Sequence, residues 1–170
     1  MGRPTNRIDH VIWIVRPENI ERYVEEATRL FGVEFERLSG PSLDGASKDI
    51  YISFDGGLEF IAPLTPTDPM SRKFQDFLDE HGEGLYGLVF AVDRLVDRIT
   101  DARQLGYPAT DMLQSPDPGV RRNFLASYTR RCIDAQEAYI GSLVGTEVVF
   151  GEFVYPDASD PVAARADVTG

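Results

Sequence analysis

The sequence predicts an α+β fold in which the order strand, helix, three strands occurs twice. Apolar and polar residues alternate in RIDHVIWIV, residues 7–15, as in a half-buried β-strand, and apolar residues then recur at helical spacing. The same succession begins again at residue 85. The two helices end in similar phrases, LFGVEF and QLGYPA, in which an apolar residue and a glycine precede a return to extended chain. A repeat of this kind indicates two related modules.

The first module is predicted to span residues 7–64. Its helix, over residues 19–32, has Asn19 as the expected N-cap and Gly32 as the expected C-cap. Three short strands follow the helix, and Asp55-Gly56 between the last two is a strong hairpin signal. These strands are expected at residues 33–38, 48–54 and 57–63.

The second module is predicted to span residues 85–156. It begins with a strand, LYGLVFAV, and a helix that starts at Asp93 as its N-cap and ends at Gly106. Two further strand-like segments, EAYIGSLV and TEVVFGEFVYP, complete it. The modules are joined by a proline-rich connector, residues 65–84, with a short helix that carries Phe74, Phe77 and Leu78. The tail, residues 157–170, has little apolar content and is expected to be disordered.

Composition and charge argue against two classes of partner. Of the 170 residues 42% are hydrophobic, and no apolar run reaches the roughly 18 residues that would span a membrane. The formal net charge of −11 argues against nucleic acid, because binding it depends on cations that meet phosphates. The N-terminus shows no hydrophobic signal region, so we expect a cytoplasmic protein.

One segment departs from this acidic balance. VRRNFLASYTRR, residues 120–131, holds four arginines and no acid, and it is either a solvated basic face or a place that holds an anionic group. Cys132 follows it directly and is the only cysteine, which excludes an intramolecular disulfide. We expect an inert structural thiol there, because reactivity needs an accessible, electropositive setting.

His10 raises the functional question. It is one of two histidines and stands inside the apolar first strand. Such an imidazole is either a hydrogen-bonded core residue or a residue that faces a cavity where chemistry or metal binding occurs.

Several quoted segments together resemble the vicinal oxygen chelate superfamily, which includes glyoxalase I, methylmalonyl-CoA epimerase, extradiol dioxygenases and the bleomycin- and fosfomycin-resistance proteins. They are IDHVIWIV, GLEFIAPLTPTDP, FLDEHGEGLYGLVFAVDRLVDRITDARQLGY and VVFGEFVYP. Taken in this order, they extend over the chain to about residue 156. The likeness is strongest to methylmalonyl-CoA epimerase-like members. The resemblance implies one glyoxalase-like domain, residues 1–156, whose two βαβββ modules form a curved mixed sheet around a cleft.

The resemblance also implies a divalent metal bound by one residue from the first and last strand of each module. The corresponding positions are His10, Glu59, Gly87 and Glu152. The imidazole and the two carboxylates suit Zn, Mn, Fe, Co or Ni, whereas Gly87 offers no side chain where a histidine is expected, so the metal could be absent. His81 in the connector is the only other histidine that could reach the site.

The spacing of these positions predicts an insertion in the second module. The first pair is 49 residues apart and the second pair 65, so about 16 extra residues are expected among residues 114–140. Strand alternation places His10 with Ile12 and Ile14, Glu59 with Ile61, and Glu152 with Phe150, each on one face of its strand.

Three functions fit these residues. The first is a lyase or isomerase of the glyoxalase or epimerase type, in which a glutamate removes a proton next to a carbonyl and a metal stabilises the enediolate. Glu152 is the first choice for the base and Glu59 the second. The second is a metal-free binding protein similar to the antibiotic-resistance members, and the third an enzyme that uses His10 and the glutamates without metal. The resemblance implies a small-molecule substrate or ligand and a homodimer for each.

Overall fold

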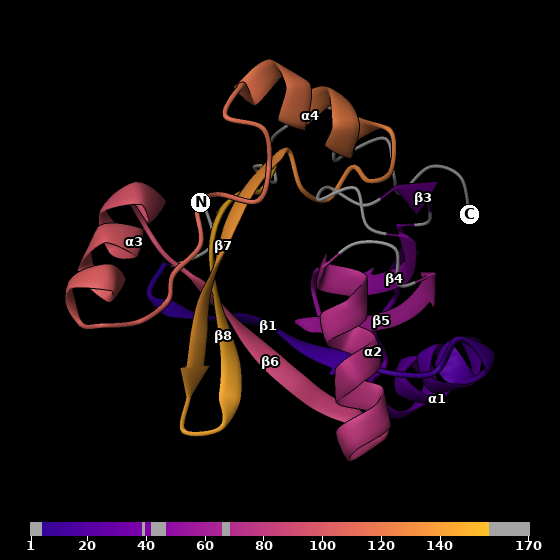
Figure 1. Ribbon diagram of the computed structural model, residues 1–170. Coiled ribbons are helices and arrows are strands. Elements are labelled where there is room, and N and C mark those ends of the chain that lie inside the picture. The colour runs from indigo at the N-terminus through magenta and orange to yellow at the C-terminus, as the bar shows by residue number, and fades with distance from the viewer. Residues whose placement is uncertain (1–4, 39, 42–46, 66–68, 157–170) are drawn as a thin grey trace. The chain divides into compact units, whose positions relative to one another are not determined.

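The computed structural model describes residues 5–38, 40–41, 47–65 and 69–156 (Figure 1). The tail predicted to be disordered, residues 157–170, lies outside the described residues. The chain forms two compact units, one of residues 8–89 with 142–148, the other of the remaining described residues at 5–7, 90–141 and 149–156. Eight strands form one hydrogen-bonded sheet in the order β2-β4-β5-β1-β6-β8-β7, and β3 pairs with β4. The α+β class predicted from the sequence is confirmed.

The larger unit holds the first module from Ile8 onward. Its elements follow the predicted order: β1 (Arg7–Ile14), the 3₁₀ turn η1 (Pro17–Asn19), α1 (Ile20–Phe31), β2 (Glu36–Arg37), β3 (Gly40–Pro41), β4 (Ser47–Ser53), β5 (Leu58–Thr65) and α2 (Pro69–His81). The first strand pairs with β5 in parallel, whereas β4 and β5 form an antiparallel hairpin. Parallel and antiparallel pairs in one sheet give the mixed sheet that the two-module pattern predicts.

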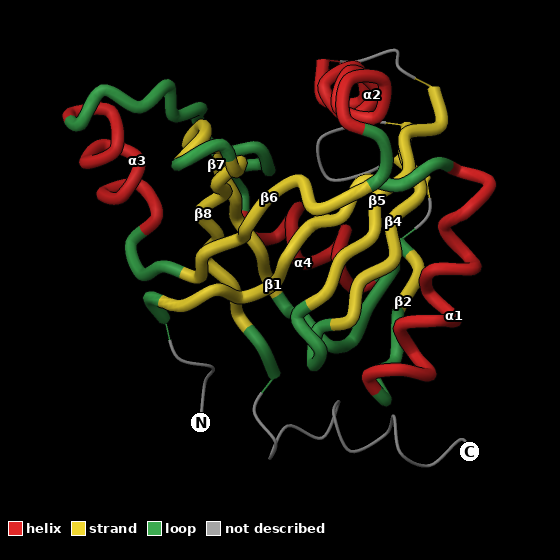
Figure 2. Tube along the Cα trace, turned by 90° about the horizontal axis from the view of Figure 1, so that it is seen from below, coloured by secondary structure: helices red, strands yellow, loops and turns green. Residues whose placement is uncertain are grey.

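The faces of β5 are covered by different helices. On one face, Phe60 and Ala62 pack with Val15, Ile20 and Ala27 in a core cluster that α1 covers. Figure 2 shows α1 and α2 at different sides of the strands β4 and β5. On the opposite face, the ammonium of Lys48 lies 5.4 Å from the ring centroid of Phe74 in α2. The alternation of side chains along the strands therefore separates an α1 face from an α2 face.

One end of α1 is formed as predicted and the other is not. Gly32 has φ +68° and its N–H donates to the carbonyl of Thr28, the left-handed C-cap that glycine favours. Asn19 precedes the helix, but its side chain does not cap it. Asn19 therefore stands at the predicted N-cap position without a capping side-chain hydrogen bond, and its amide Nδ2 donates to Oε1 of Glu83 at 2.9 Å.

The smaller unit contains α3 (Leu95–Gln104), α4 (Pro118–Ala126) and most of β7 (Asp134–Leu143) and β8 (Thr146–Val154). The last residues of β6 (Gly84–Ala91) also belong to it. Leu95, Ile99 and Ala102 form the buried face of α3. No helix of the described part of the chain is both long and apolar enough to cross a membrane.

The expected N-cap of α3 is wrong by one residue. Arg94 stands at the N-cap position with φ +53°, and Asp93 accepts a hydrogen bond from Arg98 at 3.1 Å instead of capping the helix. The free N–H of Leu95 takes its acceptor from a distant strand, as described below.

The second module departs from the first after its helix. Residues 110–113 are extended but irregular, and two backbone hydrogen bonds hold them to β7, from Thr110 N–H to Tyr139 O and from Leu113 N–H to Glu137 O, each 2.8 Å. Thr110 Oγ1 also accepts from the N–H of Tyr139 at 3.1 Å. A side-chain oxygen thus takes the place of a backbone acceptor in this pairing. The helix α4 lies within residues 114–140, where the spacing of the two ligand pairs predicts an insertion.

Candidate functional site

His10 lies in the buried part of β1. Its exposed fraction is 5%, and Ile12 and Ile14, two and four residues on, are buried on the same face of the strand. An imidazole in such a place requires hydrogen-bond partners, because an unpaired buried polar group is costly.

Two carboxylates flank the imidazole. Nδ1 of His10 lies 3.0 Å from Oδ2 of Asp9, and Nε2 lies 3.4 Å from Oε2 of Glu59. The side chains of Asp9 and Glu59 are 3% and 13% exposed. Hydrogen bonding to Asp9 favours the tautomer in which Nδ1 carries the proton, so that Nε2 faces Glu59. Nε2 carries a proton toward Glu59 only when the ring is doubly protonated.

The strand register brings Glu59 to this place. In the parallel pairing of β1 and β5, Ile12 is opposite Glu59, which puts Glu59 on the same face as His10 and two residues along the strand. The approach depends on Gly57, which has φ +65° and whose carbonyl accepts from the N–H of Val11 at 3.0 Å. A Cβ at Gly57 would lie 2.9 Å from the backbone oxygen of Asp9. The glycine turn therefore allows the close pairing that aligns the two side chains.

Asp9 is a partner of His10 that the strand pattern does not predict. Strict alternation assigns residues 9 and 10 to opposite faces of the strand. The contact forms because the short carboxylate reaches the neighbouring ring at its near nitrogen, Nδ1. An acidic residue directly before a buried histidine was the available signal.

Gly87 occupies in β6 the position that His10 occupies in β1. The two eight-residue strands show the same succession of buried and exposed residues, with Gly87 aligned to His10 and Tyr86 to Asp9. A Cβ at Gly87 would lie 2.9 Å from the backbone oxygen of Glu147 and 3.3 Å from its Cβ. The glycine is therefore required by the close approach of another backbone, and a histidine would not fit there without a shift of the chain.

Glu152, in β8, lies at the N-terminus of α3. Its Oε2 accepts a hydrogen bond from the N–H of Leu95, the first residue of the helix, at 3.1 Å. A carboxylate at this end of a helix is stabilised by the free N–H groups and by the helix dipole. The structure thus gives Glu152 a structural role that the sequence did not indicate.

His81 is separate from this arrangement. It is the last residue of α2, its side chain is 62% exposed, and its ring packs on Phe77.

The metal site that the resemblance implies stays a prediction, because Glu152 belongs to a different compact unit from His10 and Glu59. His10 Nε2 and Glu59 Oε2 have the spacing of two ligands of one ion, since donors about 2.1 Å from a tetrahedral metal are about 3.4 Å apart. A catalytic metal of this kind usually has three protein ligands. Gly87 supplies none, and Glu152 is bonded to α3. Within the described ranges, no three His, Cys, Asp or Glu side chains converge as a metal-binding group.

A hollow of about 290 Å³ lies on the other face of β1, beside α1. Trp13, Tyr23 and Phe60 line it together with the carboxylates of Glu26 and Glu83. The rings of Trp13 and Phe60 are 5.0 Å apart.

Glu83 is ionised in this hollow. Burial acts to raise the pKa of Glu83, but three hydrogen bonds outweigh it and lower the pKa below its ordinary value. The donors are the N–H of Arg16 at 2.8 Å, the amide of Asn19 at 2.9 Å and the hydroxyl of Tyr23 at 2.9 Å.

Comparison with known families agrees with this architecture. The profile of the Glyoxalase/Bleomycin resistance protein/Dioxygenase superfamily matches residues 9–124. The match covers more than half of the chain and includes β1, β5 and β6. The chain belongs to this superfamily, so the resemblance stated above is confirmed.

Solved structures show the same fold at low sequence identity. The hypothetical protein BH1468 from Bacillus halodurans is 20% identical, with 92% of this chain and 100% of that chain covered and a TM-score of 0.62. Methylmalonyl-CoA epimerase from Streptomyces coelicolor, in complex with 2-nitronate-propionyl-CoA, is 16% identical, with 88% and 98% covered and a TM-score of 0.59. The Mycobacterium tuberculosis epimerase is also 16% identical, with 89% and 92% covered and a TM-score of 0.58. No curated protein matches the sequence.

Proposed function

We propose that this protein is an enzyme of the glyoxalase and epimerase type that transfers a proton at a carbon next to a carbonyl. The observation that carries the proposal is the buried series Asp9, His10 and Glu59, with contacts of 3.0 Å and 3.4 Å on the two sides of one imidazole. Carboxylates at both ring nitrogens of one buried imidazole form a series of groups that can accept and donate a proton, which supports acid-base chemistry at this place.

The geometry suggests a division of roles. Glu59 removes the proton from carbon, and the electron pair moves to the carbonyl oxygen to form an enolate. Nε2–H of His10 donates to that oxygen, because a proton next to a carbonyl is too weakly acidic to leave without stabilisation of the developing charge. Asp9 holds Nδ1–H and thereby orients the ring, so it acts as a positioning residue. Return of the proton from Glu59 to carbon completes the cycle.

Glu152, first choice for the base from the sequence, is the alternative to Glu59 in this scheme. Its hydrogen bond to Leu95 favours a structural role. The variant Glu152→Gln distinguishes a structural role of Glu152 from a catalytic one, because glutamine can still accept from the helix N–H but cannot act as a base.

The proposed substrate class is an acyl thioester, a 2-oxoacid or a hydroxyketone. Two of the solved structures of similar fold are named for methylmalonyl-CoA epimerase, and one holds 2-nitronate-propionyl-CoA. This supports methylmalonyl-CoA as the first compound to test.

The experiment measures exchange of the proton next to the carbonyl with deuterated solvent, followed by proton NMR on methylmalonyl-CoA, a 2-oxoacid and a hydroxyketone. We expect His10→Gln and Glu59→Gln to lower the exchange rate by about 10²–10⁴-fold. Asp9→Asn should lower it less and shift the pH profile, as a positioning role requires.

Matched controls exist in this chain. His81→Gln changes the only other histidine, which is exposed, and Glu18→Gln changes an exposed glutamate. Both should retain the rate of the unchanged protein. Absence of exchange with every compound, or full activity of His10→Gln and Glu59→Gln, would overturn the proposal.

Metal assistance is tested on the same preparation. Elemental analysis after loading with Zn, Mn, Fe, Co or Ni measures the bound metal per chain. Because the described donors are two rather than three, we expect less than about one tenth of an equivalent and exchange that survives chelation. Stoichiometric binding lost in both His10→Gln and Glu152→Gln would show that a metal completes the site.

A second function, binding of an organic cation without catalysis, is favoured by the hollow beside α1. Trp13, Tyr23 and Phe60 are among its lining residues, and hydrogen bonds lower the pKa of Glu83, so aromatic rings and a carboxylate lie together as in sites for a quaternary ammonium group. Trp13 is the only tryptophan, so its fluorescence reports on this hollow directly. Phenyltrimethylammonium should change the emission more than phenol does. Equal responses to both compounds would exclude this function.

The assembly expected from the resemblance is a homodimer. Light scattering on a sizing column tests it.

A further inference from the structure

We propose that the basic segment 120–131 forms a binding pocket for a phosphate monoester with a small apolar body. The pocket is a hollow of about 340 Å³ between α4, the loop that follows it and Pro156. Arg122, Asn123 and Arg130 supply its polar groups, while Cys132, Ile133 and Pro156 supply much of its apolar lining. Neither the acid-base pair nor the hollow beside α1 includes any of these residues.

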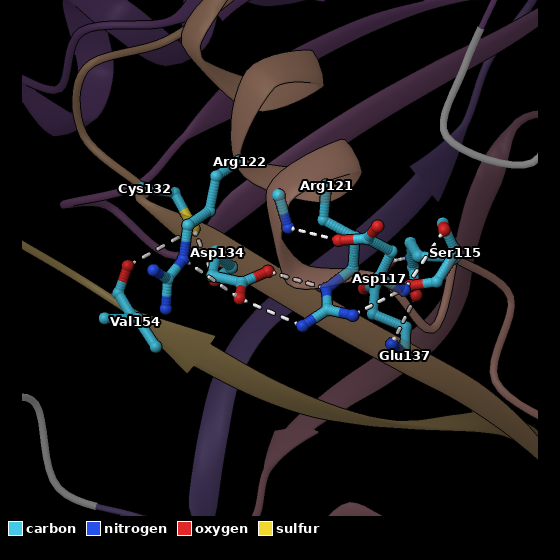
Figure 3. Close-up of polar contacts among 10 residues, drawn as sticks. Ser115, Asp117, Arg121, Arg122, Cys132, Asp134, Glu137 and Val154 are labelled. Carbon is cyan, nitrogen blue, oxygen red and sulfur yellow. Dashed lines mark hydrogen bonds and ion pairs between the residues drawn. The ribbon is translucent and has the colours of Figure 1, made fainter.

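The two neighbouring arginines of α4 have different tasks. Figure 3 shows Arg121 facing Asp134, the first residue of β7. Its Nε and Nη2 donate to the two carboxylate oxygens at 2.7 Å and 3.0 Å, and its Nη1 donates to the carbonyl of Ser115 at 2.7 Å. Arg121 is 4% exposed and Asp134 is 5% exposed. This bidentate pair anchors the inserted helix to the sheet and occupies both carboxylate oxygens of Asp134.

The positive charge of Arg122 is therefore only weakly neutralised by Asp134. Its Nε lies 3.5 Å from Asp134 Oδ2, which Arg121 already holds, and its side chain is 57% exposed. Arg130 is exposed and forms no ion pair with any residue that the structure describes. The lining contains no aspartate or glutamate, although the chain as a whole has 28 acids against 17 lysines and arginines. Two guanidinium groups at one hollow, in so acidic a protein, make a local site for an anion.

The size and lining of the hollow define the rest of the ligand. A volume of about 340 Å³ equals the space of about ten water molecules at about 30 Å³ each, more than an inorganic phosphate needs. Guanidinium groups match the oxygens of a phosphate bidentately, and the apolar side chains suit a body without charge. The shared chemistry is a phosphate group joined to a compact ring or short carbon chain.

Cys132 takes no covalent part in this site. Its sulfur contacts the carbonyl of Asp134 at 3.3 Å and that of Val154 at 3.8 Å, so it is a buried thiol donor (Figure 3). It is 3% exposed, in agreement with the structural thiol expected from the sequence.

The test is a titration of the full chain with phenyl phosphate. Calorimetry measures the affinity, and shifts of backbone amide signals in NMR locate the binding site. We expect a Kd below about 1 mM at low salt. The amide shifts should be confined to α4, residues 129–133 and Tyr155, which precedes Pro156. Inorganic phosphate lacks the apolar body and phenol lacks the charge, so each should bind at least tenfold more weakly. Added salt should weaken phenyl phosphate binding, because the exposed charges are screened.

Variants decide which residues hold the phosphate. Arg122→Gln and Arg130→Gln should each weaken binding by about tenfold or more, since each removes charge-assisted hydrogen bonds. Arg29→Gln makes the same charge change in the last turn of α1 and should leave binding unchanged. Circular dichroism checks the fold, and Arg130→Gln lies outside α4, so it tests the site even if the helix variant is destabilised.

Three results would overturn the proposal. The first is equal affinity of the two variants and the unchanged protein for phenyl phosphate. The second is equal binding of phenol or of inorganic phosphate, and the third is amide shifts at residues remote from α4 and the following loop.

Discussion

Tyr86 is expected to lower the stability of this protein through its hydroxyl group. The side chain is 4% exposed, and among the described residues its oxygen is the one buried side-chain polar atom without a hydrogen-bond partner. Phe74 and Phe77 of α2 surround the ring edge-on, each with its centroid 5.2 Å away. Burial raises the pKa of the phenol of Tyr86 above its ordinary value, so the hydroxyl is neutral near pH 7. Tyr86→Phe removes the oxygen and keeps the aromatic contacts.

The magnitude follows from the cost of an enclosed hydroxyl. Mutational data put the penalty for a buried polar group without a partner at about 1–3 kcal/mol. The variant leaves a gap of one oxygen atom, whose lost contacts offset a small part of that gain. We expect the free energy of unfolding to rise by about 1–2 kcal/mol, or Tm by about 2–8 °C for a chain of this size. Urea denaturation gives the free energy, with an unchanged m value as the check on two-state behaviour.

Tyr107→Phe provides the matched control, since Tyr107 is only half-buried. It should change the free energy of unfolding by less than about 0.5 kcal/mol. If Tyr86→Phe instead lowers the stability by more than about 0.5 kcal/mol, the hydroxyl has a partner in solution and the reasoning fails.

Three further predictions concern positions whose role the structure decides. Gly87→Ala should lower the free energy of unfolding by about 1–3 kcal/mol, because the new methyl group meets the backbone of Glu147. An unchanged urea midpoint would mean that β6 and β8 can move apart at this point without cost. The lowered pKa of Glu83 means that its carboxylate stabilises the fold above the unfolded value of about 4.3 and loses this effect as pH falls through the folded value. Glu83→Gln should therefore flatten this part of the stability curve measured between pH 5 and pH 2, and an identical curve would contradict the assignment. Arg121→Gln should cost about 3–5 kcal/mol in thermal or urea unfolding, because it leaves Asp134 buried without its partner, whereas a cost below about 1 kcal/mol would show that Asp134 is solvated.

Much of the fold could be predicted from local patterns. The alternation in RIDHVIWIV and the helical spacing before Gly32 each depend on residues close in the chain, and β1 and α1 lie where these patterns predict them. The two predicted caps differ in outcome. Asn19 stands at the N-cap of α1 but makes no capping side-chain bond and donates to Glu83. Asp93 lies one residue before the cap of α3 and accepts from Arg98, a contact that forms only once the helix is folded.

The candidate site was predicted in part. His10 and Glu59 were paired through the resemblance, and the structure places their side chains 3.4 Å apart. Asp9 was missed because strand alternation assigns it to the other face. The roles predicted for Glu152 stay predictions, and its contact with Leu95 could not be foreseen because the two residues are 57 positions apart in the sequence.

The sequence by itself determined the α+β class, the repeated module and the family, since these depend on periodicity and on the order of segments along the chain. The tertiary structure decided which polar groups meet. Parallel pairing of β1 with β5 sets Glu59 beside His10, and the close approach of Glu147 makes Gly87 a packing residue rather than only a missing ligand. Hydrogen bonds and steric contacts act over a few ångströms, so they are fixed only when segments distant in sequence are brought together.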